Sequence, residues 1–170
     1  MSENIFWNAK LPGLREPARR VSRRAVAYWT ARAALSGLVA TGAAVAIVLM
    51  TGAAAPWWCA VAAVAVAGTG YTVVMPRWRY AVHRWEVTPD ALFTRSGWFS
   101  VTWRIAPISR IQTVDSHRSI GERLFGLANV TATTASAAGP VSIRGLDQAT
   151  AGSLLDELAA VTAAVPGDAT

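Results

Sequence analysis

One region in the first half of the chain is apolar and carries no charge. Residues 33–75 include no Asp, Glu, Lys, Arg or His. This is about twice the roughly 20 residues that one helix needs to cross the hydrocarbon core of a membrane. We therefore expect two membrane-spanning helices, at 33–50 and 53–75, which form a transmembrane hairpin over 33–76.

Aromatic and basic side chains flank this region in the way that a membrane hairpin requires. Tryptophan is favoured at membrane–water interfaces, and basic residues are favoured on the cytoplasmic side. Arginines stand at both outer ends of the region, and the connecting turn has none. We therefore expect a multi-pass protein of the cell membrane with both termini in the cytoplasm. The expected interface anchors are Trp29, Arg32, Trp57, Trp58, Arg77 and Trp78.

The N-terminal residues allow a second interpretation. Ser22-Arg23-Arg24 before an apolar run is typical of a twin-arginine or ordinary signal peptide. A long basic region precedes the run, however, and a second full span follows at once, which favours a retained hairpin. Residues 1–32 are then a basic cytoplasmic arm, with seven basic and two acidic residues in a chain of net charge +6. Because this charge lies beside a membrane segment, the positive-inside rule explains it, and no nucleic acid is expected as a partner.

Beyond the apolar region, apolar and polar residues alternate with a period of two, which is typical of β-strands. Strands are expected at 80–87, 91–95, 98–106, 108–114, 130–136 and 141–144. Residues 121–126 are expected to form a short helical turn that inserts Leu124 and Phe125 into the core. An amphipathic helix over 148–164, capped by Asp147, should follow. This pattern predicts an α+β fold in which about seven strands and a C-terminal helix form a domain over residues 77–164, before a flexible tail at 165–170.

The residues predict no catalytic group, metal site or cofactor site. Asp115, Ser116 and His117 are adjacent, but on a strand Ser116 would point away from the other two, as a catalytic triad does not allow. The carboxylates are scattered, and no Gly-rich phosphate loop follows a strand. The single cysteine, Cys59, is expected to be buried against another helix, and Gln112 is expected to be buried in its strand. We therefore expect a protein that is not an enzyme.

Four arginines and one histidine in the second half form the candidate binding site. Placed on neighbouring strands and around the short helical turn, they could form a basic rim near anionic lipid headgroups, each contributing about 1 kcal/mol. The alternative is that they solvate strand edges and pair with local acids such as Asp115 and Glu122. The residues of this rim are Arg104, Arg110, His117, Arg118 and Arg123.

Several short motifs stand in an order that is known from one protein family. They are Trp85-Glu-Val-Thr-Pro-Asp-Ala-Leu92, Arg95-Ser-Gly97, Pro107-Ile-Ser-Arg-Ile-Gln112, Glu122-Arg-Leu-Phe-Gly-Leu127 and Thr133-Thr-Ala135. Over about 80–163 the chain resembles the bacterial pleckstrin-homology-like domain of the YdbS-like membrane proteins, and the hairpin fits as well. The resemblance implies a seven-stranded, strongly bent antiparallel sheet or barrel, closed by a C-terminal α-helix at the inner membrane face and without catalytic residues. Phosphoinositide-binding relatives carry basic residues in the loop joining the first two strands. The loop assigned here, 88–90, has one acid and no base.

The expected function is that of a membrane-anchored, non-enzymatic interaction module at the cytoplasmic face of the membrane. We expect a protein partner or a homo-oligomer, together with membrane lipids. Exposed sheet edges and two stripes of small residues in the spans would serve these contacts. The alternative function is an anionic lipid or ligand sensor that uses the arginine rim. The stripes are Ser36, Ala40 and Ala44 in the first span and Ala55, Cys59, Ala63 and Ala67 in the second.

Overall fold

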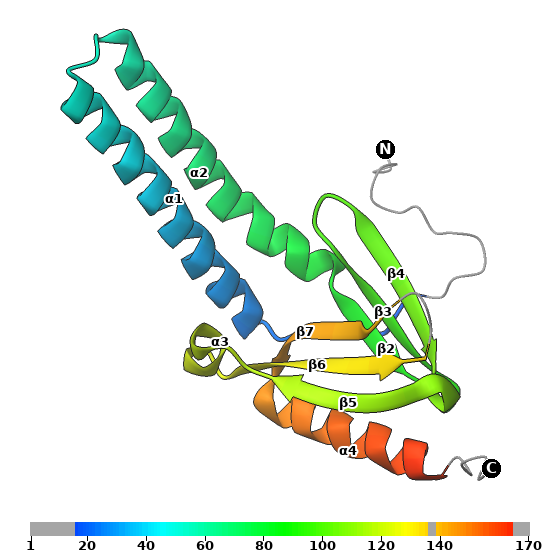
Figure 1. Ribbon diagram of the computed structural model, residues 1–170. Helices are drawn as coiled ribbons and strands as arrows, with labels where there is room; N and C mark the ends of the chain where they lie inside the picture. The colour runs from blue at the N-terminus through cyan, green and yellow to red at the C-terminus, as the bar shows by residue number, and fades with distance from the viewer. Residues whose placement is uncertain (1–15, 136–138, 165–170) are drawn as a thin grey trace, which may run out of the picture.

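The structure is a computed structural model that describes residues 16–135 and 139–164. A long helical hairpin, α1 (Arg24–Thr51) and α2 (Pro56–Val82), rises from one end of a β-domain (Figure 1). Both helices are long and apolar enough to cross a membrane and are almost wholly exposed, which indicates membrane association. The predicted helical hairpin is thus confirmed. The expected tail at 165–170 and the first part of the expected arm lie outside the described residues.

Both helices are longer than the predicted spans at the end nearest the β-domain. α1 begins at Arg24, and α2 continues through Pro76 to Val82. Pro76 has no N–H to donate, but the helix continues beyond it, and Met75, Pro76 and Val82 are all buried. The first residues of the strand expected at 80–87 are therefore helical. This extension carries Arg79 to the junction with the β-domain.

The two helices meet through glycines. A Cβ at Gly68 would lie 3.4 Å from the Cα of Gly37, so the backbones approach closely there. The two small-residue stripes lie instead mostly on exposed faces of the hairpin. Cys59 is exposed, so the prediction that it is buried against another helix was wrong. The stripe positions follow four-residue spacing, but spacing alone does not say which face meets the other helix.

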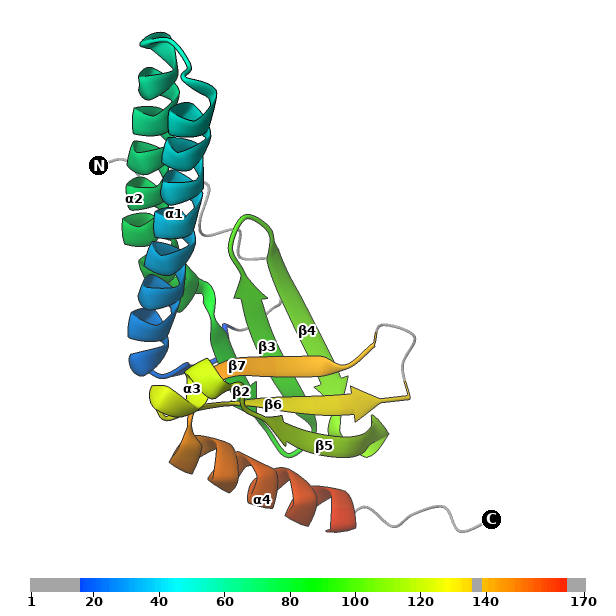
Figure 2. The same ribbon diagram turned by 60° about the vertical axis from the view of Figure 1, so that its left-hand side comes forward.

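Within the described residues, seven strands form two antiparallel sheets (Figure 2). The order in the first sheet is β1-β2-β3-β4 and in the second β5-β6-β7. The strands are β1 (Arg19–Arg20), β2 (Arg84–Val87), β3 (Ala91–Gly97), β4 (Val101–Pro107), β5 (Ile111–His117), β6 (Leu127–Thr134) and β7 (Val141–Asp147). A 3-10 turn (Ile108–Arg110) joins the sheets, and a short helix, α3 (Ile120–Leu124), lies between β5 and β6. The predicted α+β fold of about seven strands is confirmed.

The C-terminal helix α4 (Gln148–Ala164) covers the second sheet, as predicted (Figure 1). Its apolar face buries Ala151, Leu154 and Leu158 against that sheet. Each large aliphatic side chain buried in this way contributes about 1.5–3 kcal/mol. Asp147, the expected cap, accepts a hydrogen bond from the Ser22 hydroxyl at 2.7 Å. Gln112, expected to be buried, is exposed on β5.

The hairpin and the β-domain share one hydrophobic core. Ala25 and Trp29 of α1 are buried among residues of both sheets. The Ser22 N–H donates to the Gly145 carbonyl at 2.9 Å. Gly145 has a φ of +79°, and a Cβ there would lie 2.9 Å from the Cβ of Ala25. Only glycine fits both constraints, so this position fixes the close approach of β7 to α1.

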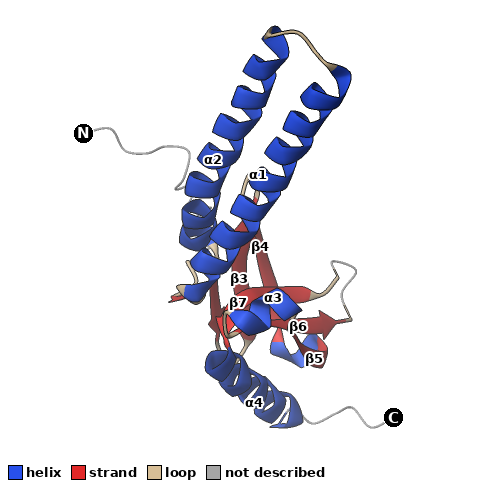
Figure 3. Cartoon of the chain, turned by 90° about the vertical axis from the view of Figure 1, so that its left-hand side faces the viewer, coloured by secondary structure: helices blue, strands red, loops and turns tan. Residues whose placement is uncertain are grey.

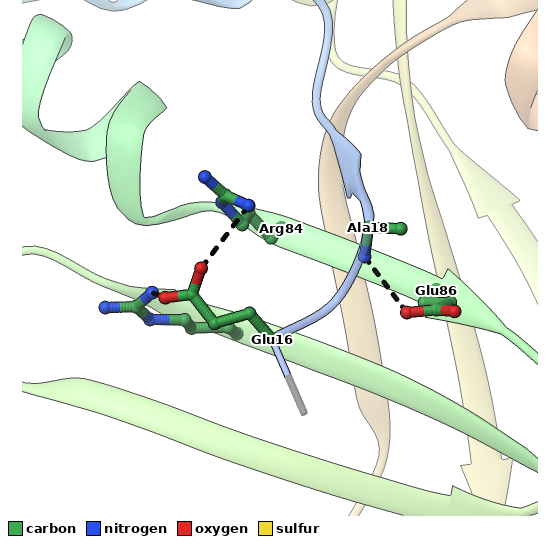
Figure 4. Close-up of polar contacts among 5 residues, drawn as sticks. Glu16, Ala18, Arg84 and Glu86 are labelled. Atoms are coloured by element: carbon green, nitrogen blue, oxygen red, sulfur yellow. Dashed lines mark hydrogen bonds and ion pairs between the residues drawn. The ribbon is translucent and has the colours of Figure 1, made fainter. Parts of the chain in front are cut away.

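The segment before α1 joins the first sheet instead of extending as a free arm. Arg19 and Arg20 pair with Trp85 and Arg84 as strand β1. The Ala18 N–H donates to Glu86, and the Glu16 carboxylate lies between Arg84 and Arg95 (Figure 4). Strand β1 therefore comes from the chain before the hairpin, whereas the other strands follow the hairpin. The sequence pattern did not predict β1.

Candidate functional site

The five residues of the predicted arginine rim lie in two separate groups. Arg104 and Arg110 line one hollow of about 340 Å³ beside Thr134, at the end of β6. The other group, His117, Arg118 and Arg123, surrounds α3 near the start of β6. The eight residues of β6 span roughly 25 Å at about 3.3 Å per residue. The structure therefore does not bring the five residues together into one rim.

The short helix α3 presents two exposed apolar side chains. Ile120 is 80% exposed and Leu124 is 81% exposed, so the prediction that Leu124 enters the core was wrong. Phe125 does pack against the core, with its ring 5.7 Å from that of Tyr28. The helix has only five residues, and Gly121 lies against Tyr28. One face of α3 (Figure 3) therefore lies against Tyr28 of α1, and the side chains of Ile120 and Leu124 stay exposed.

Hydrogen bonds hold α3 in a fixed position. Ser119 and Glu122 form a capping box, in which the Ser119 N–H donates to the Glu122 carboxylate at 2.8 Å. Asn129 donates to the same carboxylate at 2.7 Å and accepts from the Gly145 N–H at 3.0 Å. Burial raises the pKa of Glu122, but these hydrogen bonds outweigh it and the pKa lies below its ordinary value. Glu122 is thus a structural carboxylate that ties α3 to the sheet.

The predicted interface anchors occupy different surroundings. Trp57 and Trp58 are exposed at the far end of the hairpin, and Arg32 and Arg77 are exposed near the β-domain. Trp78 is half-buried. Trp29 is 5% exposed and packs in the core of the β-domain, so its ring is not free to face lipid.

The turn between β3 and β4 reaches up beside α2 (Figure 2). The ring of Trp98 stacks on that of Tyr71, with a centroid distance of 5.8 Å and an interplanar angle of 25°. The next residue, Phe99, is 95% exposed. The tip of this turn therefore places an aromatic side chain against a helix that is apolar enough to span a membrane, and leaves a second one uncovered.

The structure also shows a basic groove that the sequence pattern did not indicate. Arg32 of α1, Arg79 of α2 and Arg144 of β7 line a hollow of about 430 Å³ between the hairpin and the second sheet. A second hollow of about 470 Å³ shares Arg79 and Arg144 and adds His83 and Arg104. We call these two adjoining hollows the arginine groove. Its arginines come from four elements far apart in sequence, namely α1, α2, β4 and β7, so no local motif could have revealed it.

His83, at the C-terminal end of α2, is buried beside this groove. Its Nδ1 lies 2.8 Å from the Arg79 carbonyl oxygen, and its ring centroid lies 5.4 Å from that of Trp29. Burial, followed by the charge of Arg79 and then that of Arg144, lowers the pKa of His83 to about 4. The imidazole is therefore neutral at physiological pH.

The residues considered for catalysis and for phosphoinositide binding lie on β5 and in the loop between β2 and β3. No group of three or more His, Cys, Asp and Glu side chains that could hold a metal ion occurs within 16–135 and 139–164. Asp115, Ser116 and His117 are all exposed on β5. In the loop between β2 and β3, the Thr88 hydroxyl donates to the Ala91 carbonyl at 3.0 Å, which closes the turn. This loop joins the second and third strands of the structure, because β1 precedes them.

Comparison with known proteins gives one match. A family model described as "Bacterial PH domain" matches residues 31–162, which include most of α1, all of α2 and most of α4. No curated protein and no solved structure shows significant similarity to the chain. The more specific YdbS-like assignment stays a prediction. Since the match covers most of the chain and agrees with the two sheets and the C-terminal helix, the protein belongs to the bacterial PH domain family.

Proposed function

We propose that the protein is a membrane-anchored, non-enzymatic interaction module that holds its PH-like domain at the cytoplasmic face of the cell membrane. In this proposal the hairpin spans the membrane, both termini are cytoplasmic, and the domain assembles with a protein partner. The exposed apolar pair Ile120 and Leu124 carries the proposal. Exposed apolar side chains that are held rigidly are typical of protein–protein contacts.

The contact between the helices supports the placement in the membrane. Because α1 and α2 are antiparallel and meet at Gly37 and Gly68, Arg32 is level with Val73. The Arg77 guanidinium reaches back to the same level and donates to the Val73 carbonyl at 2.7 Å. Arg32 of α1 and the guanidinium of Arg77 of α2 thus lie at the same height along the helix axes, as expected at the cytoplasmic edge of a bilayer.

The position of α3 supports its role in binding a partner. The capping box and Asn129 fix the helix, so little conformational entropy is lost when Ile120 and Leu124 are covered. Burying one such side chain contributes about 1.5–3 kcal/mol. Arg118 and Arg123 lie beside the pair and would form the polar rim of the contact.

Site-specific photocrosslinking in intact membranes tests this proposal. A photoreactive residue replaces Ile120, Leu124 or, as the control, Ser153 on the exposed face of α4. We expect Ile120 and Leu124 to yield the same covalent adduct of defined mass, and Ser153 to yield none. The substitution L124D should abolish the adduct formed from position 120. Equal crosslinking from all three positions, or none from positions 120 and 124, would contradict the proposal.

A topology measurement tests the placement separately. In a C59S background, single cysteines replace Gln112 on β5 and Ala54 in the hairpin turn. An impermeant thiol reagent should label position 54 in intact cells and position 112 only after lysis. The reverse pattern would place the domain outside the cell.

A further inference from the structure

The arginine groove gathers positive charge without a described negative partner. Arg32, Arg79 and Arg144 form no ion pair with any carboxylate within 16–135 and 139–164. The carboxylate of Glu122 also lines the groove, but Ser119 and Asn129 already donate hydrogen bonds to it. Arginine stays protonated at any physiological pH, so its charge cannot be removed by losing a proton. Like charges that face the same groove repel each other, which is unfavourable while the groove is empty. An anion that enters the groove relieves this repulsion.

The fold holds these arginines in place. The Arg79 guanidinium lies over the ring of Trp29, 4.4 Å from its centroid, and Trp29 is buried. Arg144 precedes Gly145, whose close approach to Ala25 fixes the path of β7. His83 is neutral at the back of the groove and adds no further charge. The positive charges are therefore positioned by the core of the protein before any ligand binds.

Hydroxyl groups complement the charges. Ser142 lines both hollows, and Thr94 and Ser96 line the one nearer to Trp98. Guanidinium groups donate in a planar fork that matches the oxygens of a phosphate, and hydroxyls donate to the oxygens that remain. A phosphate is thus the anion whose geometry this set of donors fits best.

The position of the groove along the axis of the hairpin indicates which kind of molecule supplies the phosphate. Trp29 lies three residues from Arg32 on the side of the β-domain, or about 4.5 Å along the helix axis. The polar layer of each leaflet is roughly 5–7 Å thick. With Arg32 at the edge of the hydrocarbon core, the Arg79 guanidinium lies within the layer that contains lipid phosphates.

We propose that the arginine groove binds the phosphate of an anionic phospholipid of the inner leaflet, between Arg79 and Arg144, with Arg32 at its upper edge. The inference rests on the membrane placement proposed above but not on a protein partner. Trp98, which stacks on Tyr71, lines the groove on the membrane side, where the acyl chains leave. This site lies away from the loop at 88–90 and contains only Arg104 and His117 of the sequence-predicted rim.

Native mass spectrometry of the full chain, released from bilayers that contain phosphatidylglycerol and phosphatidylcholine, tests the proposal. The variant R79Q/R144Q removes two charges from the groove. The control R23Q/R110Q removes two charges from exposed positions that line neither hollow. We expect the wild type and the control to retain phosphatidylglycerol under conditions that strip phosphatidylcholine. In R79Q/R144Q the retained phosphatidylglycerol should fall about tenfold or more, because each charge-assisted hydrogen bond contributes about 1.5–3 kcal/mol.

A second measurement distinguishes a lipid from a soluble phosphate. Inorganic phosphate is added to the detergent-solubilised protein, and its melting temperature is compared with that in chloride at equal ionic strength. Retention of phosphatidylglycerol with no phosphate-specific shift supports the lipid. A phosphate-specific shift that R79Q/R144Q abolishes, without retained lipid, would overturn the lipid and assign the groove to a soluble phosphate compound. Equal loss of phosphatidylglycerol from both variants would overturn the site itself. So would a wild type that retains no phosphatidylglycerol and shows no phosphate-specific shift of its melting temperature. Photocrosslinking at Ile120 is unaffected by any of these outcomes, so the two proposals fail separately.

Discussion

Two groups of arginines in this protein stand in opposite electrostatic situations. Across β2 and β3, Arg84 and Arg95 share the carboxylate of Glu16, and their side chains are 23% and 11% exposed. In the arginine groove, Arg79 and Arg144 have no described carboxylate as a partner. Both groups connect segments that are far apart in sequence. Only the first group has a carboxylate of the described residues as its ion-pair partner.

This difference separates a structural role from a binding role. A carboxylate held between two arginines stabilises the fold, because its removal takes a shared anionic partner away from two partly buried charges. Arginines without such a partner gain no ion pair within the described residues, and in our proposal a ligand supplies the negative charge. Substitutions in the first group should therefore lower stability, and substitutions in the second should lower binding alone.

The largest effect is expected where β7 meets α1, because that contact forms the groove. In G145A the residue keeps its positive φ, and its Cβ lies against Ala25. Strain and overpacking together should lower the free energy of unfolding by about 2–4 kcal/mol. In the control G152A the Cβ meets nothing within 4 Å in a helix, and we expect a gain of about 0.5–1 kcal/mol. Denaturant unfolding of the β-domain, followed by tryptophan fluorescence, measures both. Equal stability of the two variants would contradict the assigned role of Gly145.

A pH effect of similar size is expected at His83. Its pKa is about 4 in the folded protein and about 6.5 when unfolded, so below pH 6.5 the unfolded chain binds the proton more tightly. Stability should be complete above about pH 6.5 and should fall by up to about 3 kcal/mol as the pH approaches 4. Phosphatidylglycerol should reduce this loss, because an anion beside Arg79 and Arg144 weakens their repulsion of the imidazolium. Thermal melts at several pH values, with H83Q as the control, test this. A wild type and H83Q with the same pH dependence would exclude His83 as the cause.

A smaller loss is expected from E16Q. This substitution leaves Arg84 and Arg95 without their shared carboxylate and loosens β1 from the first sheet. Because Glu16 is 31% exposed, water screens part of the effect, and we expect a loss of about 1 kcal/mol. Denaturant unfolding of the full chain gives the value. An unchanged midpoint would show that the Glu16 contacts do not stabilise the fold.

The smallest change in stability is expected from R144Q. Without lipid, the free energy of unfolding should stay within about 0.5 kcal/mol of the wild type, or rise, because a repulsive charge is removed. The same measurement with phosphatidylglycerol present should show a stabilisation in the wild type that R144Q lacks. A large loss of stability without lipid would place Arg144 in the first group of arginines.

The sequence could predict the elements whose signal is local. The uncharged region predicted the hairpin, the period of two predicted the sheets, and the apolar face of 148–164 predicted α4. The ends of these elements were less well predicted. The change of period near Tyr80 suggested a strand, but α2 continues to Val82, which is buried.

The candidate sites could be predicted only in part, because they depend on contacts between distant segments. Leu124 was expected inside, but a helix of one turn that is tied by Glu122 and packed on Tyr28 leaves it outside. Arg79 and Arg144 are adjacent only because α2 continues past Pro76 and Gly145 lets β7 approach α1. Neither the continuation of α2 nor the close approach of β7 to α1 leaves a pattern in the residues around these arginines.

The most direct test of the account is a solid-state NMR measurement of dipolar coupling between lipid phosphorus and arginine guanidinium nitrogens, in bilayers that contain phosphatidylglycerol. We expect a coupling within hydrogen-bonding range in the wild type and in R23Q/R110Q, and its loss in R79Q/R144Q. A coupling that R79Q/R144Q retains unchanged, or no coupling in the wild type, would contradict the central claim that this groove holds a lipid phosphate.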